Sequence, residues 1–492
     1  MSDQPRGALL PKKWNENRSL RDYFDGAVFF AALLIVAFRW EVVGCLVYLG
    51  IVGAVLVLSD RISDAFLPLI LMTVFVTRCY DSFDVFIRYI PFYAVVLLCV
   101  AFHLIYYFKK PTFGTSFPGL VAVTVALTLG GIGSLSAAAY FRPMNLYYVL
   151  GLGIMMPILY VVAKPRADAE ARDRFTRALF LAGCLAAFAV AIFYARGWNE
   201  FRETYHALSF QSSNNLATFL MISLPIGFWY SKQNRALLFL PVLQYLALLF
   251  CDSRGGTIFG TLEFFALLVF FCFYRSDRFR RICFIAIALL IVVLAVALLP
   301  RVLTFYRYDE KIPHFSELTF RQLLRAAFTS VVDNGEARVG LLKRSFADFK
   351  SNPLFGVGLG YTGNEDLYHP VKGAMNWYHM WLPQIWGSLG IVGLLCFGYQ
   401  LFLRIKLAFT RREFPEVTLS LCYAGLLLMS QVNPGEFCPF PYALIATSIF
   451  ILIEPPPKVG TTEPEETAPE EPEPAESELS SEVQHFLQFV SP

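Results

Sequence analysis

Apolar runs long enough to cross a bilayer recur through most of this chain, separated by short polar stretches. A helix needs about 20 largely apolar residues to span the hydrocarbon core, and most of these runs approach that length. The composition agrees, because 56% of the 492 residues are hydrophobic and only 16% are charged, against about 25% charged in soluble proteins. The sequence therefore predicts an all-α polytopic membrane protein and excludes a soluble globular domain.

The apolar runs predict about 12–14 transmembrane helices. They lie near 26–39, 42–59, 64–78, 86–107, 117–139, 145–163, 177–195, 214–231, 236–252, 257–274, 282–300, 385–403, 416–432 and 439–453. The chain then divides into a cytoplasmic N-terminal segment (1–25), about eleven helices (26–300), an extracytoplasmic loop subdomain (301–384), about three helices (385–453) and an acidic tail (454–492). The tail is rich in Pro and Glu, so we expect it to be disordered and cytoplasmic.

Basic residues in short loops set the expected orientation, because they favour the cytoplasmic side. With the N-terminus placed inside, alternation of the spans puts every dense basic cluster of a short loop on that same side. These clusters are Lys12 to Arg21, Lys109/Lys110, Lys164 to Arg177, Lys232/Arg235, Arg275 to Arg281 and Arg404 to Arg412. The long loop 301–384 is then expected outside.

Two amphipathic helices are predicted in this outer loop. The first follows Ser316, a possible N-cap, and carries apolar residues at helical spacing from Phe320 to Val331. The second covers Glu336 to Lys350 and ends before Pro353, since proline disfavours helix in the residue that precedes it. Together they indicate a small subdomain that rests on the outer surface of the bundle.

Three glycines follow, Gly356, Gly358 and Gly360, alternating with bulky apolar residues. Their spacing indicates either a tight turn or a close backbone approach. The stretch is not a nucleotide-binding loop, because no Lys-Ser/Thr pair follows it and the expected side is wrong for ATP.

Four polar residues are expected near the outer membrane surface. Arg254 interrupts two apolar runs, where an ionisable residue either snorkels or has a function. Asn214 opens another span and could act as an N-cap, Arg338 lies on a loop helix, and His379 ends the loop among aromatic residues. Each alone has an ordinary structural reading. Together, two arginines suited to phosphate and a histidine able to accept a proton fit a lipid-linked diphosphate donor and a hydroxyl acceptor.

Neither carboxylates nor cysteines in the sequence suggest a metal site. The outer loops contain no Asp-x-Asp, and the adjacent pair Glu365 and Asp366 would point apart on a regular element. The ten cysteines lie mostly inside apolar runs and show no metal-ligand spacing. We therefore expect arginines, rather than a metal, to neutralise the diphosphate.

Four stretches resemble the O-antigen ligase and polymerase family of polytopic glycosyltransferases, over about 180–400 of the chain. Two of them are SSNNLATFLMISLPIG, with Asn214 at the place of the family's Asn, and DSRGG, with Arg254 in its Ser-Arg-Gly turn. The third is EARVGLLKRSFADFKSNPLFGVGLG, with Arg338. The fourth is HMWLPQIWGSLGIVGLL, with His379, Gln384 and Gly390 in register. Met380 and Pro383 depart from the family pattern beside the histidine.

The resemblance implies transfer of a glycan from undecaprenyl diphosphate to an acceptor hydroxyl, at the outer face of the bacterial cytoplasmic membrane. It implies a reaction that uses no nucleotide, metal or other cofactor. Its partners would be the lipid-linked donor, a glycan or lipid acceptor and membrane lipids, with no nucleic acid. A base near the acceptor hydroxyl, on the face of the sugar carbon opposite the leaving group, would give direct displacement with inversion. His379 would be the general base, and Arg254 and Arg338 would contact the diphosphate. Possible supporting residues are Asn214, Gln384, Arg321, Arg325 and His369, which is also the alternative base.

Three other functions stay open. A polymerase of the same family differs from a ligase only in its acceptor. A polysaccharide or lipid transporter would show an internal repeat and charged residues at the membrane midplane. The sequence shows no clear repeat, and Arg88 and Glu263 are the exceptions among otherwise uncharged midplanes. An assembly or signalling protein that acts through the acidic tail is supported by the tail alone.

Overall fold

The structure is a computed structural model and describes most of the chain up to residue 455. The described residues are 18–78, 90–133, 148–196, 210–234, 237, 239–251, 253–273, 282, 285–286, 289, 319–359, 378–433 and 435–455. Within these ranges every regular element is helical, which confirms the all-α prediction. Residues 1–457 form one compact unit, and the second unit, 458–492, lies outside the described residues.

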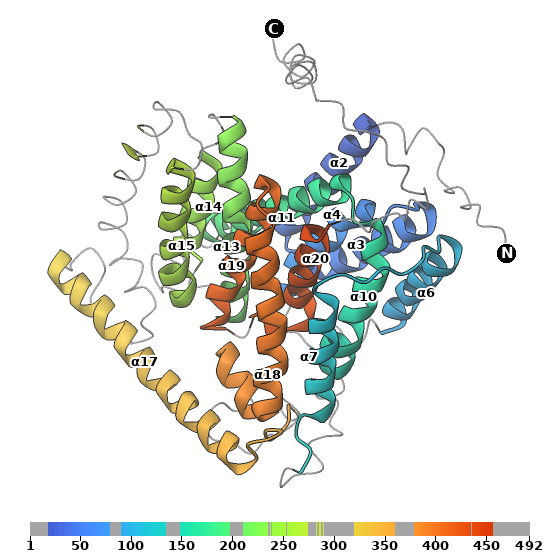
Figure 1. Cartoon of the computed structure of the whole chain (residues 1–492). Helices are drawn as coiled ribbons and strands as arrows, with labels where there is room; N and C mark the ends of the chain where they lie inside the picture. Colours follow the sequence, from blue (N-terminus) through green and yellow to red (C-terminus); the bar gives the residue numbers. More distant parts are fainter. Residues whose placement is uncertain are drawn as a thin grey trace, which may run out of the picture. The chain divides into compact units, whose positions relative to one another are not determined.

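The described helices run in the following order along the chain (Figure 1). The first half contains α2 (Arg18–Phe38), α3 (Glu41–Leu58), η1 (Ile62–Ala65), α4 (Phe66–Arg78), α6 (Ile90–Tyr106), α7 (Phe117–Leu129), η2 (Val149–Ile154), α10 (Met155–Ala163), η3 (Lys164–Arg166) and α11 (Ala169–Arg196). The second half contains α13 (Phe210–Gln233), α14 (Phe239–Leu249), α15 (Arg254–Phe273), α17 (Phe320–Ser351), α18 (Trp381–Thr410), α19 (Phe414–Ser430), η6 (Gly435–Phe437), η7 (Pro439–Ala443) and α20 (Leu444–Ile453).

Five helical segments among the described residues are long and apolar enough to cross a membrane. They are Glu41–Leu58, Val149–Arg166, Ala169–Arg196, Arg254–Phe271 and Trp381–Thr410. Six shorter apolar helices accompany them. The predicted span 282–300 and Arg88 fall almost wholly outside the described residues.

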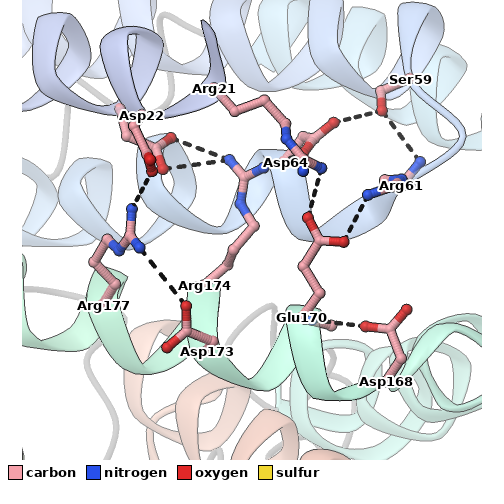
Figure 2. A network of polar contacts seen from close by, with 12 residues as sticks. Arg21, Asp22, Ser59, Arg61, Asp64, Asp168, Glu170, Asp173, Arg174 and Arg177 are labelled. Carbon is pink, nitrogen blue, oxygen red and sulfur yellow. Dashed lines mark hydrogen bonds and ion pairs between the residues drawn. The ribbon is translucent and has the colours of Figure 1, made fainter. Parts of the chain in front are cut away.

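Ion pairs hold one end of the bundle together (Figure 2). Arg174, near the start of α11, is buried and bridges Asp25 of α2, at 3.1 Å, and Asp64 of η1. One turn earlier on α11, Glu170 pairs with Arg21 of α2 at 2.5 Å. Because buried charges are costly unless they are paired, these contacts fix α2 and η1 against α11. We call this the basic end of the bundle.

Helix ends from the second half of the chain meet at the same basic end. Arg172 of α11 pairs with Glu416 of α19 at 2.7 Å, and the Lys232 ammonium of α13 lies 4.4 Å above the centre of the Phe414 ring. These contacts agree with the alternation expected from the basic clusters. Since α18 leads directly into the start of α19, the starts of α13 and α18 lie at the opposite end.

Glu454, the first residue of the expected tail, is buried at the basic end. Its carboxylate accepts a hydrogen bond from the Tyr160 hydroxyl and another from the Ser116 N–H at 2.5 Å. It also pairs with Lys164 at 3.3 Å. The ordered chain therefore includes Glu454, while the tail from residue 456 lies outside the described residues.

In the described part of the predicted outer loop, 319–359, there is one long helix where two were expected. α17 runs for 32 residues without a break, so Arg338 lies inside it and does not begin a second helix. Its cap is Thr319, whose N–H and hydroxyl both donate to Gln322 Oε1, at 2.8 and 2.7 Å, and Ser316 is not the cap. The segment Asn334-Gly335 suggests a break, but one helical glycine costs only about 1 kcal/mol. α17 does end just before Pro353, as predicted.

Helix α18 is interrupted at Gly390, which has φ +64° and ψ −154°. The interruption leaves helical N–H and C=O groups without their usual partners. The segment that follows α17 supplies those partners through four backbone hydrogen bonds. The bonds are Val357 N–H to Gly387 O (3.0 Å), Gly358 N–H to Ser388 O (2.9 Å), Ile391 N–H to Pro353 O (2.8 Å) and Val392 N–H to Leu354 O (3.2 Å). We call this contact between 353–358 and 387–392 the glycine joint.

Only glycine fits at the closest points of the joint. A Cβ atom on Gly356 would lie 2.3 Å from the Ser388 carbonyl carbon, and one on Gly390 would lie 2.5 Å from the Pro353 oxygen. The end of α7 joins them, because the Gly131 N–H donates to the Phe355 carbonyl at 2.9 Å. The structure contains both features expected of the glycine-rich stretch, a tight turn closed by the Gly356 N–H to Asn352 O hydrogen bond (2.8 Å) and a close backbone approach.

We expect Gly390→Ala and Gly356→Ala to lower the thermal unfolding midpoint strongly, because each adds a clash with backbone at a positive φ. Gly398→Ala on α18 and Gly340→Ala on α17 are matched controls, since a Cβ there meets nothing within 4 Å. The controls should be neutral or stabilising by about 1 kcal/mol. Equal midpoints for all four purified variants would contradict the joint.

Glu263 of α15 is buried against α19, where a Cβ on Gly425 would lie 2.4 Å from its Oε1. Neither carboxyl oxygen has a hydrogen-bond partner among the described residues. A buried polar group without a partner costs about 1–3 kcal/mol, so we expect Glu263→Met to raise the thermal unfolding midpoint. Glu263→Gln, which keeps a polar group at this position, should raise the thermal unfolding midpoint less than Glu263→Met does. A midpoint lowered by the Met variant would show that the carboxyl stabilises the fold.

Candidate active site

His379 lies in the turn that leads into α18 and has φ +53°, a left-handed conformation uncommon outside glycine. Gln384 holds this turn, because its Oε1 accepts the Tyr378 N–H at 3.0 Å and its Nε2 donates to Ser388 Oγ at 3.0 Å. Gln384 is fully buried, so water does not compete for its amide. Pro383 sits in the first turn of α18, where a helix does not need its missing N–H. The departure at Pro383 is thus compatible with the turn.

The imidazole of His379 is half-buried and lies within the field of Arg338. Burial and, second, the positive charge of Arg338 lower the pKa of His379 to about 4. At neutral pH the ring is therefore neutral and can accept a proton. Arg338, itself half-buried on α17, lies near enough to this histidine to act on its charge.

Side chains of α17 hold it against the start of α18. The Tyr378 hydroxyl donates to Asp348 Oδ2 at 2.6 Å, and Asp348 also pairs with Arg344 at 3.1 Å. Nearby, Trp386 Nε1 donates to Ser345 Oγ at 2.9 Å. Neither Tyr378 nor Asp348 was predicted as a site residue, because no local sequence pattern shows that residues 30 positions apart meet.

Arg254 is the first residue of α15, and Ser253 shapes the turn that presents it. Ser253 Oγ accepts the Gly256 N–H at 3.0 Å, as an N-cap does, and donates to Asn214 Oδ1 at 2.6 Å. Asn214 lies one turn inside α13, so it is not an N-cap. Instead it supports the Arg254 turn. Ser253 was missed, although a serine before an apolar helix is a common cap signal.

The residue after Asn214 joins the same region to the C-terminal part of the chain. Asn215 Oδ1 accepts a hydrogen bond from the Tyr442 hydroxyl of η7 at 2.6 Å, and both side chains are buried. In the short helix η6, which precedes η7, Glu436 pairs with the buried Arg404 of α18. The segment after α19 therefore folds back into the bundle and braces the start of α13.

The predicted site residues form two groups at the end opposite the basic end. One group contains His379, Arg338 and Gln384, and the other contains Arg254 and Asn214. Arg321 and Arg325 are exposed near the start of α17. Arg325 lies about 20 Å along the helix from Arg338, so these two arginines do not belong to the histidine group. His369 lies outside the described residues. Among those described, no group of three or more His, Cys, Asp or Glu could hold a metal ion.

A family comparison covers most of this site. The model of the O-antigen ligase family matches residues 236–398, from just before α14 to the middle of α18. Residues 236–398 therefore correspond to an O-antigen ligase domain, and this match supports an assignment to the O-antigen ligase and polymerase family. The match includes Arg254, Arg338, His379 and Gln384, whereas Asn214 precedes it. No curated protein matches the chain.

We expect His379 to react with diethyl pyrocarbonate as a neutral imidazole over an unusually wide pH range. Its rate constant, followed by mass spectrometry of the labelled peptide, should stay nearly flat from about pH 7.5 to about pH 5.5, and fall by half only near pH 4. An ordinary histidine loses most of its reactivity over that range. A midpoint near 6.5 would contradict the shifted pKa.

Proposed function

We propose that this O-antigen ligase-family protein moves a glycan from undecaprenyl diphosphate to an acceptor hydroxyl, at the outer face of the bacterial cytoplasmic membrane. The observation that carries the proposal is the position of His379, in a half-buried turn near Arg338 inside the matched domain. A neutral base next to a fixed cation suits a reaction in which a hydroxyl loses a proton while a diphosphate leaves.

In this reaction His379 accepts the proton of the acceptor hydroxyl. The acceptor oxygen then attacks the anomeric carbon as the bond between that carbon and the diphosphate oxygen breaks. Attack from the face opposite the leaving group inverts the anomeric centre. Undecaprenyl diphosphate departs with the bonding electron pair, and the developing charge is greatest in the transition state. Fixed cations at that place therefore accelerate the step.

Arg338 and Arg254 are the cations we assign to the diphosphate. A guanidinium donates two parallel hydrogen bonds to phosphate oxygens. Arg254 has further support, because the N-terminus of α15 carries partial positive charge and directs backbone N–H groups outward. The Ser253–Asn214 hydrogen bond keeps this turn in place.

The deciding experiment uses purified protein in liposomes with undecaprenyl-diphosphate glycan and candidate acceptors. A single transferred product identifies a ligase, and a ladder of lengthening glycans identifies a polymerase of the same family. Absence of any product with every acceptor would contradict the transferase and favour the transporter.

In the same assay, we expect His379→Ala to lower transfer by at least about 100-fold, because it removes the base. Arg338→Ala should lower it by about 100-fold or more through loss of charge stabilisation. Lys343→Ala is the matched control, since Lys343 is an exposed cation on the same helix and should matter little. Full activity of a correctly inserted His379→Ala protein would overturn the assignment.

A further inference from the structure

Tyr378, next to the candidate base, is fixed at both of its ends. Its N–H donates to Gln384 of α18, and its hydroxyl donates to Asp348 of α17 at 2.6 Å. The ring is fully buried against α18, where a Cβ on Gly387 would lie 2.7 Å from it. A side chain held in this way connects the turn of His379 directly to the neighbouring helix.

Asp348 is on the same continuous helix as Arg338, about 15 Å further along it. An unbroken helix moves as a rigid rod over this distance, so a contact at Asp348 constrains where Arg338 can lie. The contact is strong, because a hydroxyl bound to a buried carboxylate forms a charge-assisted hydrogen bond.

We infer that the Tyr378–Asp348 hydrogen bond is a positioning contact that holds α17, and with it Arg338, in register with His379. The base and the cation for the leaving diphosphate are then aligned as one unit. The catalytic meaning of this inference rests on the proposed function, whereas the alignment itself does not. Tyr378 and Asp348 act through their neighbours and are positioning residues.

The charges around His379 make the alignment measurable. On this part of α17 the charged residues are Arg338, Lys343, Arg344, Asp348 and Lys350, and Arg338 is the one that acts on the imidazole. The described first turn of α18, 381–384, carries no charge. If α17 shifts away, the ring loses both the field of Arg338 and part of its burial.

The test compares two hydrogen bonds that join the same helices. Tyr378→Phe removes the hydroxyl but keeps the buried ring, and Ser345→Ala removes the partner of Trp386 without touching the turn. Peptide-resolved labelling of His379 with diethyl pyrocarbonate reports the pH midpoint of the ring in each purified protein. We expect the midpoint to rise by at least about one pH unit in Tyr378→Phe, toward the ordinary 6.5. Ser345→Ala should leave it in place.

An unchanged midpoint in a folded Tyr378→Phe protein would overturn the inference, and so would an equal shift in Ser345→Ala. Asp348→Asn, which keeps an acceptor oxygen, should shift the midpoint less than Asp348→Ala does. In the liposome assay, Tyr378→Phe should lower kcat about 10-fold with little change in KM, because binding groups remain but their alignment is lost. Failure of the proposed function would appear separately, as full transfer by His379→Ala.

Discussion

The backbone exchange at Gly390 is the contact on which the candidate site depends. A helix interrupted within an apolar bundle has N–H and C=O groups that lipid cannot satisfy. The segment after α17 satisfies these groups with its own backbone. The two backbone segments come so close that Gly356 and Gly390 have no room for a side chain. The glycine joint therefore satisfies the backbone groups left free in α18 and holds the segment that follows α17. It also holds the residues after α7 beside that segment.

This arrangement explains how a polar site can be built beside membrane helices. His379 and Gln384 precede the interruption, and Asp348 precedes the segment that fills it. The glycine joint thus holds the end of α17 against α18 with backbone hydrogen bonds, and the side chains of Gln384 and Tyr378 hold the histidine turn itself. Side chains around it remain available for chemistry, and the turn keeps a left-handed histidine that would otherwise relax.

The sequence predicts the helices of this protein far better than it predicts their contacts. The length of an apolar run is a local property, so the expected spans at 42–59 and 416–432 agree closely with α3 and α19. The two helices predicted at 320–331 and 336–350 form one helix, because the polar residues between their apolar stripes do not interrupt the helical backbone. An N-cap was one of the two roles considered for Asn214, and the structure excludes it because α13 begins four residues before the apolar run. Contacts such as Tyr378–Asp348 join distant positions and leave no periodic signal, so only the fold reveals them.

The burial of Glu454 determines at which end of the bundle α20 ends. Its bonds to Lys164 and Tyr160 attach the end of α20 to the same end of the bundle as the start of α2. Residues 454–455 therefore lie at the same end of the bundle as the start of α2. A reporter enzyme fused after residue 455 would show on which side of the membrane this end of the bundle lies. A fusion that replaces Glu454 would remove its contacts with Lys164 and Tyr160, so the reporter would no longer be attached to an intact bundle end.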